Sequence, residues 1–109
     1  MARKQETNIQ DKIRVALSKE GCLPFRCNVG NFYTKYGQEV KIGVKGHSDL
    51  YGIKPGGKAF FIEVKTPIGS ARDEQLKFIQ AVKNKGAYAG FARSVEDALK
   101  IVFPENYKK

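Results

Sequence analysis

A glutamate and a lysine interrupt an otherwise apolar segment of the chain, Phe60 to Lys65. The segment has the length and the β-branched and aromatic content of a strand that is covered on both faces. Glu and Lys are rarely buried in such a strand unless they are paired or take part in chemistry. Because side chains alternate along a strand, Glu63 and Lys65 point to the same face, about 6.6 Å apart. A metal-binding carboxylate beside an amine that steadies a water or a developing charge suits phosphodiester hydrolysis.

A second carboxylate, Asp49, is expected to lie beside Glu63. Asp49 falls in an expected strand over residues 47–53, and a turn at 55–57 joins it to the next strand as a hairpin. Two carboxylates that meet on one face repel each other unless a cation lies between them. Mg²⁺ prefers carboxylate and carbonyl oxygens as ligands. The alternative is that Asp49 or Glu63 forms an ion pair with Lys65 without any metal.

The segment after this hairpin is expected to form a helix over residues 71–85, with Ser70 as its N-cap. Its apolar residues recur at the spacing of one helix face, and Gln75 occupies the first place of that stripe. We therefore expect Gln75 to face the sheet near the strand ends. A half-exposed glutamine at a helix start is an equally common arrangement, and both readings stay open on the sequence alone.

An amphipathic helix is expected over residues 5–19, and Gly21 is a suitable stop signal. Glu6 and Gln10 are one helical turn apart and share a face, so Glu6 could reach the metal site. The alternative is a surface pair, or a capping box with Thr7 as the N-cap. The apolar stripe consists of Ile9, Ile13, Ala16 and Leu17.

The remaining elements complete an α/β pattern with a mixed sheet. The segment around Gly37, Gly43 and Gly46 is expected to be a loop, and the tail from Tyr107 to be frayed. Residues 101–103 are either a last strand or the end of a helix. The further expected elements are strands over 24–29, 32–34 and 87–92, and a helix over 95–99 capped by Ser94.

The chain of 109 residues has a net charge of +9, which favours a polyanionic partner, nucleic acid first and an acidic membrane surface second. No segment is long enough to cross a membrane and no apolar signal segment follows the N-terminus, so we expect a cytoplasmic protein. Cys22 and Cys27 are expected to be reduced thiols. A zinc site needs four ligands and only His47 could supplement them, and a disulfide, although geometrically conceivable, is disfavoured in a reducing compartment.

Basic and aromatic residues around the glycine-rich segment are candidates for DNA contact. The candidates for phosphate contacts are Arg26, Lys35, Lys41 and Lys45. Tyr33 and Tyr36 could stack on exposed bases, or form core or dimer contacts instead. For any single lysine the alternative is a solvated charge. His47 is expected to be simply hydrogen-bonded and is left out of the catalytic set.

The order and spacing of these motifs resemble the VRR-NUC group, the virus-type replication-repair nucleases of the PD-(D/E)XK nuclease superfamily. The resemblance extends from about Glu6 to Leu99. Its carriers are Glu6 with Gln10 and Ile13, Arg26-x-Asn28-x-Gly30, Gly46-His47-Ser48-Asp49-Leu50, Phe61-Ile62-Glu63-Val64-Lys65, Glu74-Gln75-x-x-Phe78, and Ala92-Arg93-Ser94-Val95-Glu96-Asp97-Ala98.

The resemblance implies a role for each matching residue. Asp49 and Glu63 would be Mg²⁺ ligands, with Mn²⁺ as a substitute, helped by the backbone carbonyl of Val64. Lys65 would orient the nucleophilic water and stabilise charge at the phosphate. Gln75 would hold the lysine, a water or the scissile phosphate. Glu6 would be an outer ligand, or a ligand of a second metal.

The resemblance also implies a restriction-endonuclease-like core in the order α-β-β-β-α-β, with a mixed central sheet flanked by helices. Residues 1–109 would form a single nuclease domain, similar to the stand-alone form carried by phages and acting in the host cell cytoplasm. That form is similar in function to enzymes that resolve four-way (Holliday) junctions, so the resemblance implies an endonuclease that would act as a homodimer. The alternatives are a flap or nicking nuclease of the same chemistry, and a non-catalytic nucleic-acid-binding module.

Overall fold

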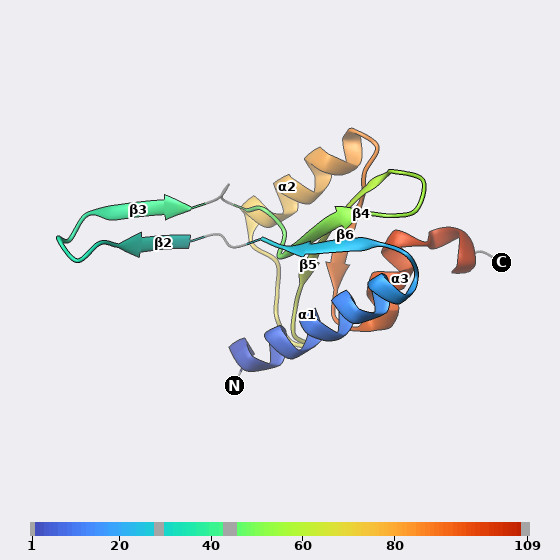
Figure 1. Ribbon diagram of the computed structural model, residues 1–109, viewed down its shortest axis with the longest axis horizontal. Helices are drawn as coiled ribbons and strands as arrows, with labels where there is room; N and C mark the ends of the chain where they lie inside the picture. The colour runs from blue at the N-terminus through green and yellow to red at the C-terminus, as the bar shows by residue number, and fades with distance from the viewer. Residues whose placement is uncertain (1, 28–29, 43–45, 108–109) are drawn as a thin grey trace.

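Helices and strands alternate along the chain in a mixed α/β arrangement (Figure 1). This computed structural model describes residues 2–27, 30–42 and 46–107. The strands are β1 (Leu23–Arg26), β2 (Gly30–Tyr33), β3 (Glu39–Ile42), β4 (Leu50–Ile53), β5 (Ala59–Val64) and β6 (Tyr88–Ala92). The helices are α1 (Ala2–Lys19), α2 (Asp73–Asn84), α3 (Val95–Val102) and the short 3₁₀ helix η1 (Pro104–Tyr107). The predicted α/β class and the order of the core elements are confirmed.

Four strands form the central sheet in the order β1-β4-β5-β6. The pairs β1–β4 and β4–β5 are antiparallel, and the predicted hairpin aligns Leu50 with Ile62 and Ile53 with Ala59. β6 pairs with β5 in parallel, which requires a crossover connection, and α2 supplies it. The sheet is therefore mixed, as predicted from the sequence.

One face of the sheet forms the main hydrophobic core. Phe60, Ile62 and Val64 alternate along β5 and are completely buried, because α1 and α3 cover this face. α1 contributes Ile13 and Leu17 from its apolar stripe, both also fully buried. Burying side chains of this size stabilises the fold by about 1.5–3 kcal/mol each. This packing holds β5 rigidly, and with it the residues on its other face.

The opposite face carries the side chains that alternate with this core. Figure 1 shows α2 on the side of the sheet away from α1 and α3. Phe78 of α2 packs against Phe61 of β5 with their ring centroids 5.7 Å apart, and Ile79 is buried. Glu63 lies on this second face, two residues beyond Phe61.

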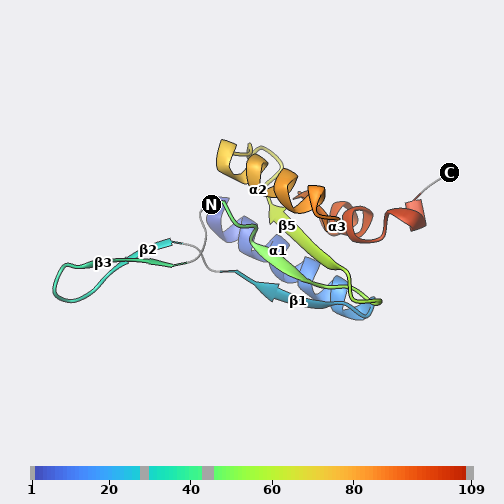
Figure 2. The same cartoon turned by 90° about the horizontal axis from the view of Figure 1, so that it is seen from above.

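The β2–β3 hairpin corrects one expectation, because a strand, β3, lies within the segment expected to be a loop. The two strands align Gly30 with Ile42 and Tyr33 with Glu39, and they form a separate two-stranded sheet. Gly37 supplies the turn with a φ of 83°, a conformation that favours glycine. Both views show the hairpin projecting away from the central sheet (Figures 1 and 2).

Two predicted helix starts were wrong. α1 begins at Ala2, so Thr7 lies inside the helix and is not its N-cap. α2 begins at Asp73 with Arg72 rather than Ser70 as its N-cap. The Oε1 of Gln75, the third residue of α2, accepts the N–H of Arg72 at 3.0 Å, as in a capping box, and Gln75 is itself held by Lys65 and Glu63.

The C-terminal region settles two further expectations. Ser94 caps α3 as predicted, since its Oγ accepts the N–H of Asp97 at 3.1 Å. α3 continues to Val102, so residues 101–102 end a helix rather than form a strand. Tyr107 belongs to η1 rather than to a frayed tail. Both cysteines are free thiols, as expected, and across the described ranges no helix has the length and apolar character needed to span a membrane.

Candidate functional site

The two predicted carboxylates meet where β4 and β5 separate. The last aligned pair of the hairpin at this end is Leu50 with Ile62. Beyond it, the N–H of Asp49 donates to Oε1 of Glu63 at 3.2 Å, and the N–H of Val64 donates to Oδ2 of Asp49 at 2.9 Å. Side-chain carboxylates therefore take the place of main-chain acceptors, and both acidic groups are held by the backbone. The sequence prediction that Asp49 and Glu63 lie close together is confirmed.

Gln75 links the carboxylate pair to the lysine. Its Oε1 accepts from Nζ of Lys65 at 2.7 Å, and its Nε2 donates to Oε2 of Glu63 at 2.7 Å. With the Arg72 N–H also bound, the amide is held in one orientation. Gln75 is buried, so the expectation that it faces the sheet is confirmed and the half-exposed alternative is wrong.

The direct contact between Lys65 and Glu63 is longer than either bond to Gln75. Nζ of Lys65 lies 3.8 Å from Oε2 of Glu63, and both side chains are buried. The ion pair considered from the sequence is therefore present alongside the carboxylate pair. An ammonium has three donors, and the bond to Gln75 uses one of them, so donors remain for a water or a phosphate oxygen.

The turn after β6 supports the main chain around Lys65. The N–H of Lys65 donates to the carbonyl of Ala92 at 2.9 Å. The guanidinium of Arg93 donates to the carbonyl of Thr66, and the N–H of Arg93 donates to Oδ2 of Asp97 at 2.9 Å. Sequence reasoning gave Arg93 no role, although it lies within one of the recognised motifs. Its contribution depends on the parallel pairing of β5 and β6, which no local pattern shows.

The segment before Asp49 is fixed against α2. The hydroxyl of Ser48 is buried and donates to the carbonyl of Leu50 at 2.8 Å. Nδ1 of His47 lies 2.8 Å from the carbonyl oxygen of Ser48, and because a carbonyl only accepts, Nδ1 carries the proton. The ring packs 4.6 Å from that of Phe78, so His47 is hydrogen-bonded and packed, as expected.

Gly46 adds a steric reason for this arrangement. Its φ is 85°, and a Cβ at this position would lie 2.5 Å from the carbonyl oxygen of Glu74. A side chain there would both strain the backbone and push the segment away from the first turn of α2. Glycine thus permits the close approach that places Asp49 and Gln75 on the same site.

Burial makes this site electrostatically unfavourable for two free carboxylates. Burial first, and the charge of Asp49 second, raise the pKa of Glu63 to about 8, although Lys65 acts in the opposite direction. The pKa of Glu6 is also raised, by burial first and by Asp49 second, while Lys65 and Arg72 lower it. Glu6 on α1 therefore lies close enough to the site for the charges of Asp49 and Lys65 to shift its pKa.

The donor set fits an oxygen-preferring divalent cation that keeps several waters. Asp49 and Glu63 supply carboxylate oxygens, and burial first and the charge of Asp49 second raise the pKa of Glu63, so a cation or a proton is favoured beside it. Within the described residues, no three or more His, Cys, Asp and Glu side chains form a group that could hold a metal by themselves. Glu6 is therefore not gathered with Asp49 and Glu63 into a three-carboxylate site.

Among the basic residues predicted to contact DNA, Arg26 and Lys35 have described side chains, and these two lie on different elements. Arg26 is exposed at the end of β1, and Lys35 is exposed at the tip of the β2–β3 hairpin. Lys45 lies outside the described residues, and for Lys41 only the backbone, in β3, is described. Tyr36 is 81% exposed at the hairpin tip.

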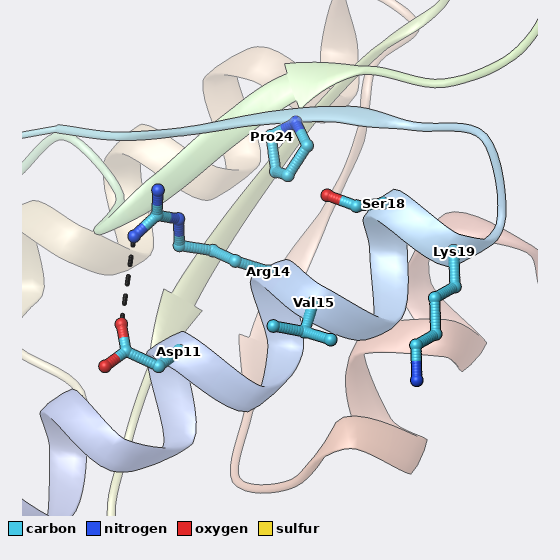
Figure 3. Close-up of a pocket in the computed structure, with 6 residues that line it drawn as sticks. All are labelled: Asp11, Arg14, Val15, Ser18, Lys19 and Pro24. Atoms are coloured by element: carbon cyan, nitrogen blue, oxygen red, sulfur yellow. Dashed lines mark ion pairs between the residues drawn. The ribbon is translucent and has the colours of Figure 1, made fainter.

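A surface hollow of about 550 Å³ lies between α1 and β1 (Figure 3). It is lined by Asp11, Arg14, Val15, Ser18, Lys19 and Pro24. Asp11 and Arg14 form an ion pair across 3.8 Å, one turn apart on α1. None of the residues at the junction of β4 and β5 lines this hollow, so it is separate from the carboxylate site.

Asp49 lies directly before β4 rather than within the strand, Glu63 lies near the end of β5 and Lys65 just beyond it, and Gln75 comes from the next helix. An aspartate and a Glu-x-Lys at the ends of adjacent strands, with this glutamine, are the arrangement of a PD-(D/E)XK nuclease. The model of the VRR-NUC domain matches residues 4–96, and the chain belongs to this family. A solved structure of a VRR_NUC domain is similar with a TM-score of 0.67, over 95% of this chain and 98% of that chain. At 22% identity, this likeness supports the fold. No curated protein matches the sequence.

Proposed function

We propose that this protein is a Mg²⁺-dependent, structure-selective DNA endonuclease that cuts four-way junctions as a homodimer. The observation that carries the proposal is the linked set of Asp49, Glu63, Lys65 and Gln75 at the end of the central strands. Family membership supports a nuclease with DNA as substrate. Nucleases of this type generally use divalent metals, and Mn²⁺ is the expected substitute.

The two carboxylates and the carbonyl of Val64 would hold the cation. When bound, a divalent cation supplies positive charge to a phosphate oxygen and lowers the pKa of a bound water. The backbone N–H groups of Asp49 and Val64 keep the two carboxylates oriented before any ligand arrives. Such preorganisation avoids a reorganisation cost during the reaction.

Lys65 would act on the nucleophilic water and on the charge that develops at the phosphate. Gln75 holds the ammonium at 2.7 Å and at the same time binds Glu63, so it keeps the two groups apart and aligned. The Arg93 guanidinium and the Ala92 carbonyl hold the main chain at Thr66 and Lys65 in place through hydrogen bonds. Positioning of this kind matters because a displacement of about 1 Å costs about 100-fold in rate.

The charge balance supports DNA as the partner. The chain carries a net charge of +9, yet its candidate site contains two acidic groups. Acidic groups weaken contact with a phosphate backbone unless a cation reverses the local sign. A binding module without catalysis would account for the basic surface but would leave the carboxylate pair without a purpose.

Branched DNA and a dimer form the finer part of the proposal. A two-fold pair of subunits would present two sites symmetrically, and a four-way junction is a target with matching symmetry. A monomer would make one cut, which suits a flap or a nick. The test is therefore the symmetry of cutting together with the molar mass in solution.

The experiment compares cleavage of a labelled four-way junction, a flap and a linear duplex in Mg²⁺. We expect paired nicks in opposing arms of the junction and a dimer by sedimentation. Lys65→Ala should abolish cleavage while junction binding survives. Lys77→Ala, an exposed lysine on α2, is the matched control and should cut normally.

Two results would contradict the proposal. Cleavage by Lys65→Ala at the rate of the unmodified protein would remove the assigned site. Cutting confined to the flap would instead favour the second candidate, a repair nuclease of the same chemistry.

A further inference from the structure

The β2–β3 hairpin stands outside the central sheet as an arm, residues 30–42. In the described part of the chain, β2 and β3 are hydrogen-bonded only to each other. The molecule measures 56 × 32 × 25 Å, and Figure 1, with the longest axis horizontal, shows the arm extending along it. A hairpin that packs on nothing is marginally stable in water. Such an arm is expected to contact a partner.

The tip of the arm is closed by its own hydrogen bonds. The N–H of Thr34 donates to the carbonyl of Gln38 at 2.8 Å, and the N–H of Gly37 donates to the carbonyl of Thr34 at 2.9 Å. The hydroxyl of Thr34 accepts from the N–H groups of Tyr36 and Gln38 at 3.3 and 3.1 Å. The backbone of the tip is therefore ordered although every residue from Thr34 to Glu39 is exposed.

The tip presents an aromatic ring beside a positive charge. Tyr36 is 81% exposed, and Nζ of Lys35 lies 5.2 Å from the centre of its ring. Tyr107, by comparison, is 42% exposed. A ring at this position gains nothing from burial in the fold. An aromatic face with an adjacent cation suits an unpaired nucleotide, because the base stacks on the ring and the cation binds phosphate.

The described residues on either side of the arm, Cys27 and Gly46, lie beside the candidate active site. The N–H of Cys27, which precedes the arm, donates to the carbonyl of Asp49 at 2.8 Å. Gly46, which follows the arm, is pressed against the first turn of α2. At about 3.3 Å per strand residue, the described stretch from Gly30 to Tyr36 spans about 20 Å, less than one turn of B-form duplex. One DNA molecule can therefore contact the tip and the site together.

We propose that Tyr36 stacks on an unpaired or unstacked base of the DNA, with Lys35 at the neighbouring phosphate. The phosphate backbone of the same DNA molecule then lies at Asp49 and Glu63. This inference rests on the proposed function in taking DNA as the substrate, and it adds the residue that selects the substrate. The bases of an intact duplex have no free face. A branch point, a flap or a gap offers one, so the tip favours such DNA over linear duplex.

The test measures binding without cleavage, in EDTA, to a four-way junction that carries 2-aminopurine at the branch point and to a linear duplex of the same length. The proteins are the unmodified chain, Tyr36→Ala, Tyr36→Phe and a control, Tyr107→Ala. Tyr107 is a suitable control because it also has a lysine, Lys100, near its ring, at 5.8 Å.

We expect Tyr36→Ala to weaken junction binding by about 5- to 150-fold, the range for losing one stacked base, and to abolish the change in 2-aminopurine fluorescence. Duplex binding should change by less than about twofold, because an intact duplex has no free base face to lose. Tyr36→Phe keeps the ring and should bind the junction normally, as should Tyr107→Ala.

Four results would overturn the inference. These are an unchanged junction affinity in Tyr36→Ala, an equal loss on junction and duplex, a loss in Tyr36→Phe as large as in Tyr36→Ala, and a change in oligomeric state caused by Tyr36→Ala. A Tyr36-dependent fluorescence signal without cleavage in Mg²⁺ would refute the proposed function and leave the inference standing. Normal junction cleavage and binding by Tyr36→Ala would refute the inference alone.

Discussion

The substitution Asp49→Asn should stabilise the metal-free protein at high pH while abolishing its activity. An asparagine at this position keeps an oxygen that can accept the N–H of Val64, which Asp49 accepts at 2.9 Å. It removes the negative charge that helps to raise the pKa of Glu63. The carboxylate repulsion is thus relieved without loss of the local hydrogen bond.

The size of the effect follows from the pKa of Glu63. A rise from 4.5 to about 8 corresponds to about 5 kcal/mol of differential interaction. Burial is the largest cause and the charge of Asp49 the second, so that charge accounts for part of this energy, on the order of 1–2 kcal/mol. For a domain of this size, that gain corresponds to a rise in Tm of about 4–8 °C.

The direction of the pH dependence is fixed by linkage. The folded-state pKa of Glu63 lies above its ordinary value, so the folded state binds the proton more tightly than the unfolded state does. The stabilising contribution of the protonated Glu63 to the free energy of unfolding is complete below about pH 4.5 and is lost as the pH rises through about 8. The advantage of Asp49→Asn should therefore be small at pH 5 and largest above pH 8.

The assay is thermal unfolding in EDTA at pH 5 and pH 8.5, with Asp11→Asn as the matched control. Asp11 is exposed and pairs with Arg14 at 3.8 Å, so its substitution should have the same small effect at both pH values. Excess Mg²⁺ or Mn²⁺ at pH 8.5 should raise the Tm of the unmodified protein but not that of Asp49→Asn. An advantage of Asp49→Asn that is equal at both pH values would refute the reasoning.

Three further substitutions test the support of the site. Gln75→Ala should lower the cleavage rate by about 10- to 1000-fold in single-turnover assays and destabilise the fold by about 1–3 kcal/mol. The reason is that Lys65 and Glu63 lose a buried hydrogen-bond partner. A normal cleavage rate would argue against a positioning role for Gln75. Gly46→Ala should lower the Tm, measured by calorimetry, because its Cβ meets the backbone of α2; an unchanged Tm would contradict the steric argument. Arg93→Ala should lower the cleavage rate more than it weakens DNA binding. Recovery of the cleavage rate in Arg93→Lys would support a hydrogen-bonding role for Arg93 at the loop after Lys65. Equal losses in rate and affinity would indicate direct DNA contact.

The carboxylate site could be predicted from the sequence because it depends on short-range geometry. A tight hairpin places Asp49 beside Glu63, and strand alternation places Lys65 on the same face as Glu63. The helical stripe placed Gln75 against the sheet. Each of these relations follows from a period of 2 or 3.6 residues within a few tens of residues.

Other features of the structure were not predicted from these local sequence periods. The N-cap of α2 is Arg72 rather than Ser70, since its N–H is satisfied by Gln75, whose orientation depends on Lys65. Arg93 reaches Thr66 only because β5 and β6 pair in parallel, far apart along the chain. β3 was missed although Glu39-Val40-Lys41-Ile42 alternates polar and apolar residues, because the glycines and lysines around it favoured a loop.

The most direct test of the central claim is a comparison of Asp49→Asn with the unmodified protein on a labelled four-way junction in Mg²⁺. The account predicts that the unmodified protein makes paired nicks, whereas Asp49→Asn binds the junction and remains folded but makes none. Cutting by Asp49→Asn at the unmodified rate would contradict the assignment of the site between β4 and β5.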